Sequence, residues 1–97
     1  MDETDVRERA EAHAGAIAEG DLRRAGKDLT EAAMAGAGEV MKRMPGNVTA
    51  AHIMTLDGEG DSYVVTIRYD GSDGEATVES HWAEVDGRPR ITAMRVV

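Results

Sequence analysis

The chain has 97 residues, of which 41% are hydrophobic and only 3% aromatic, and its formal net charge is -8. This length predicts a single domain over residues 1–97 with one modest core, built from Ala, Val, Ile, Leu and Met because Phe is absent. Both halves are acidic and no basic stripe is present, which argues against nucleic acid and anionic membrane surfaces as partners.

The sequence carries no sign of export, membrane insertion or metal binding. Cysteine is absent, which excludes disulfides and thiolate metal sites and is typical of a reducing compartment. The first five residues are acidic and no apolar segment follows them, so neither a secretory signal nor a membrane span is predicted. We therefore expect a cytoplasmic protein without a cofactor.

Residues up to about 44 show helical periodicity. One stripe, from Val6 to Ile17, predicts a first helix over about 5–19, which Gly20 ends. Asp21 is expected to cap a short second helix, and Thr30 a third that stops before Pro45. The second and third helices are predicted either as separate elements or as one bent element. The glycines at 36 and 38 weaken the third helix, and the sequence offers no reason for them unless a close contact between helix and sheet requires glycine there.

From about residue 48 the apolar period changes to two, which is typical of strands. Gly/Asp clusters at 57–61, 70–74 and 86–89 predict three hairpin turns between strands near 48–57, 62–70, 75–85 and 90–97. Connections this short join antiparallel neighbours. The predicted fold class is therefore α+β, with N-terminal helices packed on a curved four-stranded antiparallel meander.

Loops of four residues predict a register that pairs residue 57 with 62, 70 with 75, and 85 with 90. This register gathers the apolar residues of the strands on one inner face. It also places four polar residues on that face, and these are the candidates for a site: His52, Ser80, Glu84 and Arg95. Ser80 is expected opposite Arg95, and Tyr63 opposite Trp82.

The segment Ala18-Glu19-Gly20-Asp21-Leu22 leads from the first predicted helix into the second, and the hairpin over 82–91 contains Asp86-Gly87-Arg88. The first segment resembles the step into a second helix, and the second the final hairpin, of the nuclear transport factor 2-like (SnoaL-like) superfamily. The resemblance implies a cystatin-like fold in which the meander forms a cone around the helices. Because the chain is short and poor in aromatics, we expect a smaller cavity than is usual in the family.

The resemblance implies either a ligand carrier, an association module or an enzyme. In an enzyme, His52 is expected to act as the general base of an isomerase, cyclase or dehydratase for a small carbonyl compound, with Arg95 or a tyrosine stabilising the enolate. The alternative is that His52 only caps a small core. For Arg95 the alternative is a surface position paired with Glu84.

The remaining candidates are weighed in the same way. Tyr63, Tyr69, Ser80 and Trp82 join His52 and Arg95 as candidate ligand-binding residues, although aromatic residues are more often core. Ser80 has no nucleophile-elbow context. The histidines at 13, 52 and 81 are not expected to converge, so no metal site is predicted.

The predicted outer face of the sheet is unusually apolar, so we expect a second copy of the chain to cover it. The residues assigned to this homodimer interface are Val64, His81, Met94 and Val96. The alternative for His81 is a bond to water or Glu79. The first functional hypothesis is thus a homodimeric association module or binder of a small apolar ligand, and the second is the enzyme. A third is a partner-dependent accessory subunit.

Overall fold

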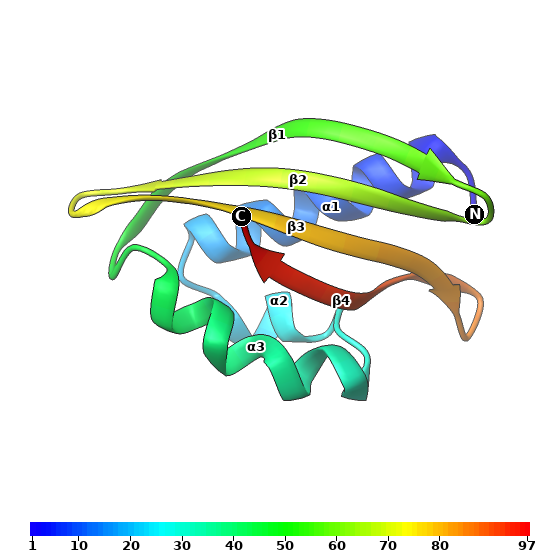
Figure 1. The fold of residues 1–97 in the computed structure, drawn as a ribbon, viewed down its shortest axis with the longest axis horizontal. Coiled ribbons are helices and arrows are strands. Elements are labelled where there is room, and N and C mark those ends of the chain that lie inside the picture. The colour runs from blue at the N-terminus through cyan, green and yellow to red at the C-terminus, as the bar shows by residue number, and fades with distance from the viewer.

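The computed structural model describes all residues 1–97 and contains three helices followed by four strands. The elements are α1 (Glu3–Ala18), α2 (Leu22–Gly26), α3 (Glu31–Arg43), β1 (Val48–Glu59), β2 (Ser62–Gly71), β3 (Gly74–Val85) and β4 (Arg88–Val96). The strands form one antiparallel sheet in the order β1-β2-β3-β4, which curves over the helices (Figure 1). The predicted α+β class, with helices packed on a four-stranded antiparallel sheet, is confirmed.

The start of each helix is fixed by a side-chain cap. α1 begins two residues earlier than predicted, because Asp2 and Asp5 form a reciprocal capping box with bonds of 2.9 and 3.2 Å. The predicted caps of the other two helices are confirmed. The Asp21 carboxylate accepts a bond from Arg24 N at 3.1 Å, and Thr30 Oγ1 accepts one from Ala33 N at 3.3 Å.

The second and third helices are separate elements. Residues 27–30 leave the helical path between them and run beside β4, where Leu29 and Ile91 form an isolated parallel bridge. Ile91 N donates to Asp28 O at 2.7 Å, and Thr30 N donates to Ile91 O at 2.9 Å. This segment therefore pairs with β4 along the edge of the sheet. A continuous helix through residue 28 would remove this pairing.

The two glycines inside α3 do not mark a close contact with the sheet, so the one reason considered for them does not apply. Gly36 and Gly38 are exposed, and a Cβ atom added to either would meet nothing within 4 Å. α3 instead packs inward through Ala33, Ala37 and Val40. Nothing in the packing requires glycine at positions 36 and 38.

All three hairpins turn through two residues. The predicted pairing of Asp70 with Glu75 is confirmed. The other two hairpins are tighter than expected, with Glu59 opposite Ser62 and Val85 opposite Arg88. In the last turn both central residues have positive φ, 54° at Asp86 and 79° at Gly87, which is typical of a type I′ turn between twisted strands.

A bulge in β1 reverses the faces that its residues present. Leu56 pairs with Val65 on the inner side, but the register shifts by one residue between Ile53 and Thr55. Upstream of this extra residue, Ala51 and Ile53 pack inward and His52 turns outward. The predicted inward position of His52 is therefore wrong, because regular alternation was assumed through the bulge.

A second bulge, at Thr92, has the same effect on β4. Trp82 pairs with Ile91, whereas His81 pairs with Ala93, so one residue is left over between them. Beyond this point Met94 and Val96 pack inward against the core. Arg95 turns outward and lies opposite Glu79 instead of Ser80, which corrects the predicted pair.

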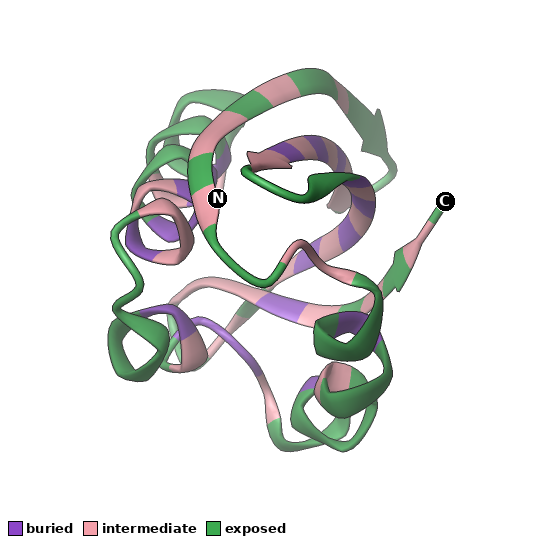
Figure 2. Ribbon diagram, turned by 90° about the vertical axis from the view of Figure 1, so that its left-hand side faces the viewer, coloured by how far each residue is buried: buried purple, intermediate pink, exposed green.

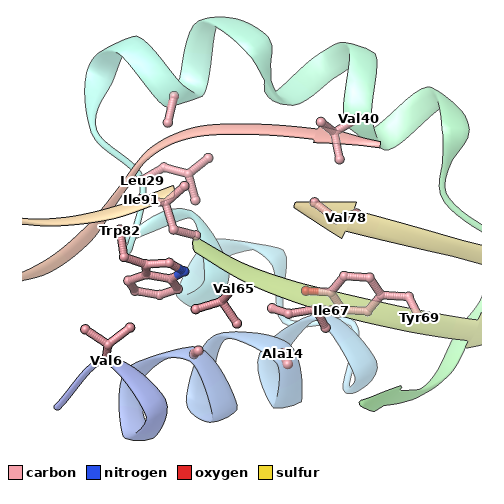
Figure 3. Packing of buried hydrophobic residues seen from close by; sticks show 12 residues of the cluster. Val6, Ala14, Leu29, Val40, Val65, Ile67, Tyr69, Val78, Trp82 and Ile91 are labelled. Carbon is pink, nitrogen blue, oxygen red and sulfur yellow. The ribbon is translucent and has the colours of Figure 1, made fainter. Parts of the chain in front are cut away.

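The core lies between the concave face of the sheet and the helices. Figure 2 shows the buried positions alternating along the central strands as the sheet curls. Trp82, Val65 and Ile91 from the sheet meet Val6 of α1, and each of these side chains has no solvent exposure. Figure 3 shows Trp82 lying above Val6, with Tyr69 at the other end of the same layer. The predicted pairing of Tyr63 with Trp82 is confirmed. None of the three helices has the length and apolar character that a membrane crossing demands.

Candidate functional site

An apolar cavity of about 160 Å³ lies between the helices and the sheet. Hydrophobic residues make up 13 of the 16 that line it. They come from all three helices and from β2, β3 and β4, and include Ile17, Leu22, Leu29, Met34, Val40, Met41, Met44, Ile67, Val78 and Met94. Leu22, Met34 and Met41 are also among the most exposed large apolar residues of the chain, at 51%, 53% and 43%. The cavity is therefore bordered by apolar side chains that water reaches.

Three polar side chains reach the cavity wall, and the first two come from the sheet. Ser80 is saturated, because its hydroxyl donates to Val65 O at 2.8 Å and accepts from Trp82 Nε1 at 3.0 Å. Tyr69 is buried to 3% exposure and its hydroxyl makes no hydrogen bond within the protein. Burial raises the pKa of this phenol above its ordinary value, so Tyr69 stays neutral.

The third polar side chain is His13, on the inward face of α1. Its Nδ1 lies 3.1 Å from Asp28 Oδ2, and both residues are buried, at 6% and 8% exposure. The Trp82 ring meets the imidazole edge to face at a centroid distance of 6.0 Å. With one nitrogen on Asp28 and Trp82 packed against it, the ring is held in place; no protein group bonds Nε2, which is not a fully buried atom.

The backbone of Asp28 is held by the last strand. Besides the bonds to Ile91, two arginines of β4 bind the same segment: Arg90 Nη2 donates to Leu29 O at 2.7 Å, and Arg88 Nη2 donates to Lys27 O at 3.0 Å. A carboxylate bonded to one imidazole nitrogen selects the tautomer and orientation of the ring. The arrangement therefore presents a fixed imidazole at the wall of an otherwise apolar cavity.

Only some of the predicted ligand-binding residues line the cavity. Tyr69 and Ser80 line the cavity. Trp82 lies behind the wall, fully buried against His13, and Tyr63 packs at the edge of the core without lining the cavity. Their roles in ligand binding stay predictions.

His52 is not brought to the cavity. Its side chain is 50% exposed on the outer face of the sheet, and Nε2 lies 3.2 Å from Asp70 Oδ2. Asp70 also pairs with Arg68, with 3.2 Å between Nε and Oδ1. Because the sheet separates His52 from the cavity, this residue cannot exchange a proton with a molecule bound there.

The outer face carries charges and threonines at its centre, and not the apolar patch that was expected. The Glu79 carboxylate accepts a hydrogen bond from Arg95 Nε at 3.1 Å and lies 3.2 Å from His81 Nε2. Both partners lower the pKa of this carboxyl group, and Arg95 has the larger effect. Val64 and His81 lie on this face as predicted. Met94 and Val96 do not, so half of the predicted interface belongs to the interior.

Sequence reasoning missed His13 and Asp28. The signal for His13 was present, because it lies three residues after Ala10 and four before Ile17, within the apolar stripe of α1. Asp28 carried no such signal, since its position depends on pairing with residue 91. No group of three or more potential ligands is placed to hold a metal ion.

Comparisons with known proteins give no family to which this chain can be assigned. No model of a protein family matches the chain. No curated protein and no solved structure matches it either.

Proposed function

We propose that the protein binds a small, mostly apolar molecule in the cavity between α3 and the sheet. The observation that carries the proposal is the cavity itself, whose wall is almost wholly hydrophobic and whose rim exposes Leu22, Met34 and Met41. Methionine side chains are flexible and polarizable, so a rim of this kind adapts to ligands of different outline. Concave apolar sites with a few polar groups are typical of ligand binding.

The cavity volume limits the size of the ligand. A void of about 150 Å³ lined by apolar side chains is large enough for benzene, so the 160 Å³ here suits a single ring or a short branched chain. For a molecule of seven or eight heavy atoms we expect a Kd on the order of 0.1–1 mM, which corresponds to about 4–5.5 kcal/mol.

The test is titration of the protein with p-xylene, followed by calorimetry or by shifts of backbone amide resonances. Ala37 lines the cavity, and Ala37→Leu should fill it and abolish binding. Ala35 lies on the exposed side of the same helix and does not line the cavity, so Ala35→Leu is the matched control and should bind normally. The proposal fails if p-xylene does not bind, or if Ala37→Leu binds it as tightly as the wild type.

A catalytic function is the second candidate, and the pairing of His13 with Asp28 favours it. An imidazole oriented by a carboxylate is a suitable general base, and Nε2 is free to take a proton from the carbon next to a carbonyl group. His13 would thus replace His52 as the base of the expected isomerase, cyclase or dehydratase. The test is deuterium uptake by 2-indanone in D₂O, which His13→Gln should abolish and His52→Gln should leave unchanged.

Association through the outer sheet face has less support, because the centre of that face is charged and only Val64 and His81 of the expected interface remain on it. Kinship with the nuclear transport factor 2-like superfamily is also part of the proposal. The order of helices followed by a curled meander, with a cavity between them, supports this kinship.

A further inference from the structure

We propose that the His13 end of the cavity is a subsite for one hydroxyl group, so that the ligand is a neutral phenol or alcohol with an apolar body. This inference rests on the proposed function, because it assumes that the cavity is occupied by a small molecule. It adds the chemical class of the ligand. It also assigns the binding role to a residue pair, His13 and Asp28, that belongs neither to the predicted ligand-binding site nor to the predicted dimer interface.

The imidazole of His13 has one nitrogen that the protein leaves without a partner. Its side chain is more than nine-tenths buried and Nδ1 is occupied by Asp28, whereas no protein group bonds Nε2, an atom that is not itself fully buried. A ligand that fills the cavity shields this nitrogen from water, and an unpaired polar group in an apolar environment is destabilising. Since His13 lines the cavity, the missing partner is expected to come from a molecule inside it.

The pairing with Asp28 decides which ligand groups fit. An ionised carboxylate only accepts hydrogen bonds, so Nδ1 carries a proton and, in the neutral imidazole, Nε2 is an acceptor. A ligand hydroxyl donates to this nitrogen. If the imidazole is protonated, Nε2 becomes a donor and the same hydroxyl accepts. A carbonyl oxygen would satisfy only the protonated form, whereas a hydroxyl donates and accepts through the same atom and suits both forms.

The rest of the cavity favours a ligand without net charge. Ser80 already uses its donor within the protein, and the remaining polar group, the Tyr69 hydroxyl, is neutral. A bound carboxylate would lie near the carboxylate of Asp28 with only the one imidazole between the two anions, and a charged group in a mostly apolar cavity is strongly disfavoured.

The experiment compares p-cresol with p-xylene, which have the same shape and differ by one hydroxyl in place of a methyl group. In the wild type, p-cresol should bind at least as tightly as p-xylene, although its hydroxyl must leave water. In His13→Leu/Asp28→Asn, which removes the imidazole and the buried charge together, p-cresol should weaken by about tenfold or more relative to p-xylene. His52→Leu, on the outer face, is the control and should keep the wild-type ratio.

A measurement on the wild type keeps the inference testable if the double variant does not fold. The ¹⁵N resonance of His13 Nε2 should move when p-cresol is added and stay in place with p-xylene. If p-xylene binds while p-cresol binds tenfold more weakly and leaves Nε2 unmoved, the hydroxyl subsite is overturned and the proposed function survives. If neither compound binds, the proposed function falls and takes the subsite with it.

Discussion

Replacing both glycines of α3 with alanine should stabilise the protein. Gly36 and Gly38 are exposed, their φ angles are helical, and an added Cβ meets open space, so alanine introduces no clash. Glycine inside a helix costs about 0.5–1 kcal/mol relative to alanine, because it loses more backbone freedom on folding. The two replacements together should therefore raise the free energy of unfolding by about 1–2 kcal/mol.

Urea denaturation followed by far-ultraviolet circular dichroism measures this change. For a slope of about 1 kcal/mol per molar urea, the midpoint should rise by about 1–2 M. The matched control is Gly87→Ala, which forces alanine to a φ of 79° and should lower stability by about 1–2 kcal/mol. An unchanged or lower midpoint in the α3 variant would refute the packing described for this helix.

Three further predictions concern buried and paired side chains. Ser80→Ala should cost about 2–3 kcal/mol in urea denaturation, because Trp82 Nε1 and a backbone carbonyl of β2 lose their partner together, and a loss below about 0.5 kcal/mol would contradict this. Tyr69 should make stability fall above pH 10, since the unfolded phenol ionises while the folded one stays protonated; at pH 11 the wild type should lose about 1.4 kcal/mol more than Tyr69→Phe, and parallel curves would refute it. The pKa of the Glu79 carboxyl group is lowered in the folded protein, so its ionised form contributes stability above the ordinary value of 4.5, and this contribution disappears as the pH falls through the folded pKa. The stability difference between the wild type and Glu79→Gln should therefore shrink in acid. A difference that is constant from neutral pH to pH 3 would contradict the pairing with Arg95.

Much of the fold could be predicted because local sequence patterns determine it. The cap residues Asp21 and Thr30, the helix stop before Pro45 and the Gly/Asp turns all act within a few residues of the chain. The central hairpin was also placed correctly, because no bulge interrupts the pairing of β2 with β3.

The candidate site could not be predicted in the same way, because single extra residues change the inward face of two strands. The shift at Met54 moves His52 out of the interior, and the extra residue Thr92 exchanges Arg95 for Met94 at the cavity wall. Alternation of polar and apolar residues does not reveal a bulge, since both phases of β1 and β4 contain apolar residues. His13 was recognisable on its helix, but its role depends on Asp28, which only the tertiary fold places beside it.

The link between residues 27–30 and β4 has a consequence for the order in which the molecule comes apart. His13 and Asp28 are close in sequence, yet the backbone of Asp28 is held by Ile91, in a strand at the edge of the sheet. β4 is also the C-terminal strand, and terminal segments open locally at a lower free energy than the core. Partial loosening of β4 should therefore free Asp28 and disable the imidazole while α1 and the central hairpin are still intact. The protein would lose ligand binding at a lower temperature than the one at which its helices unfold.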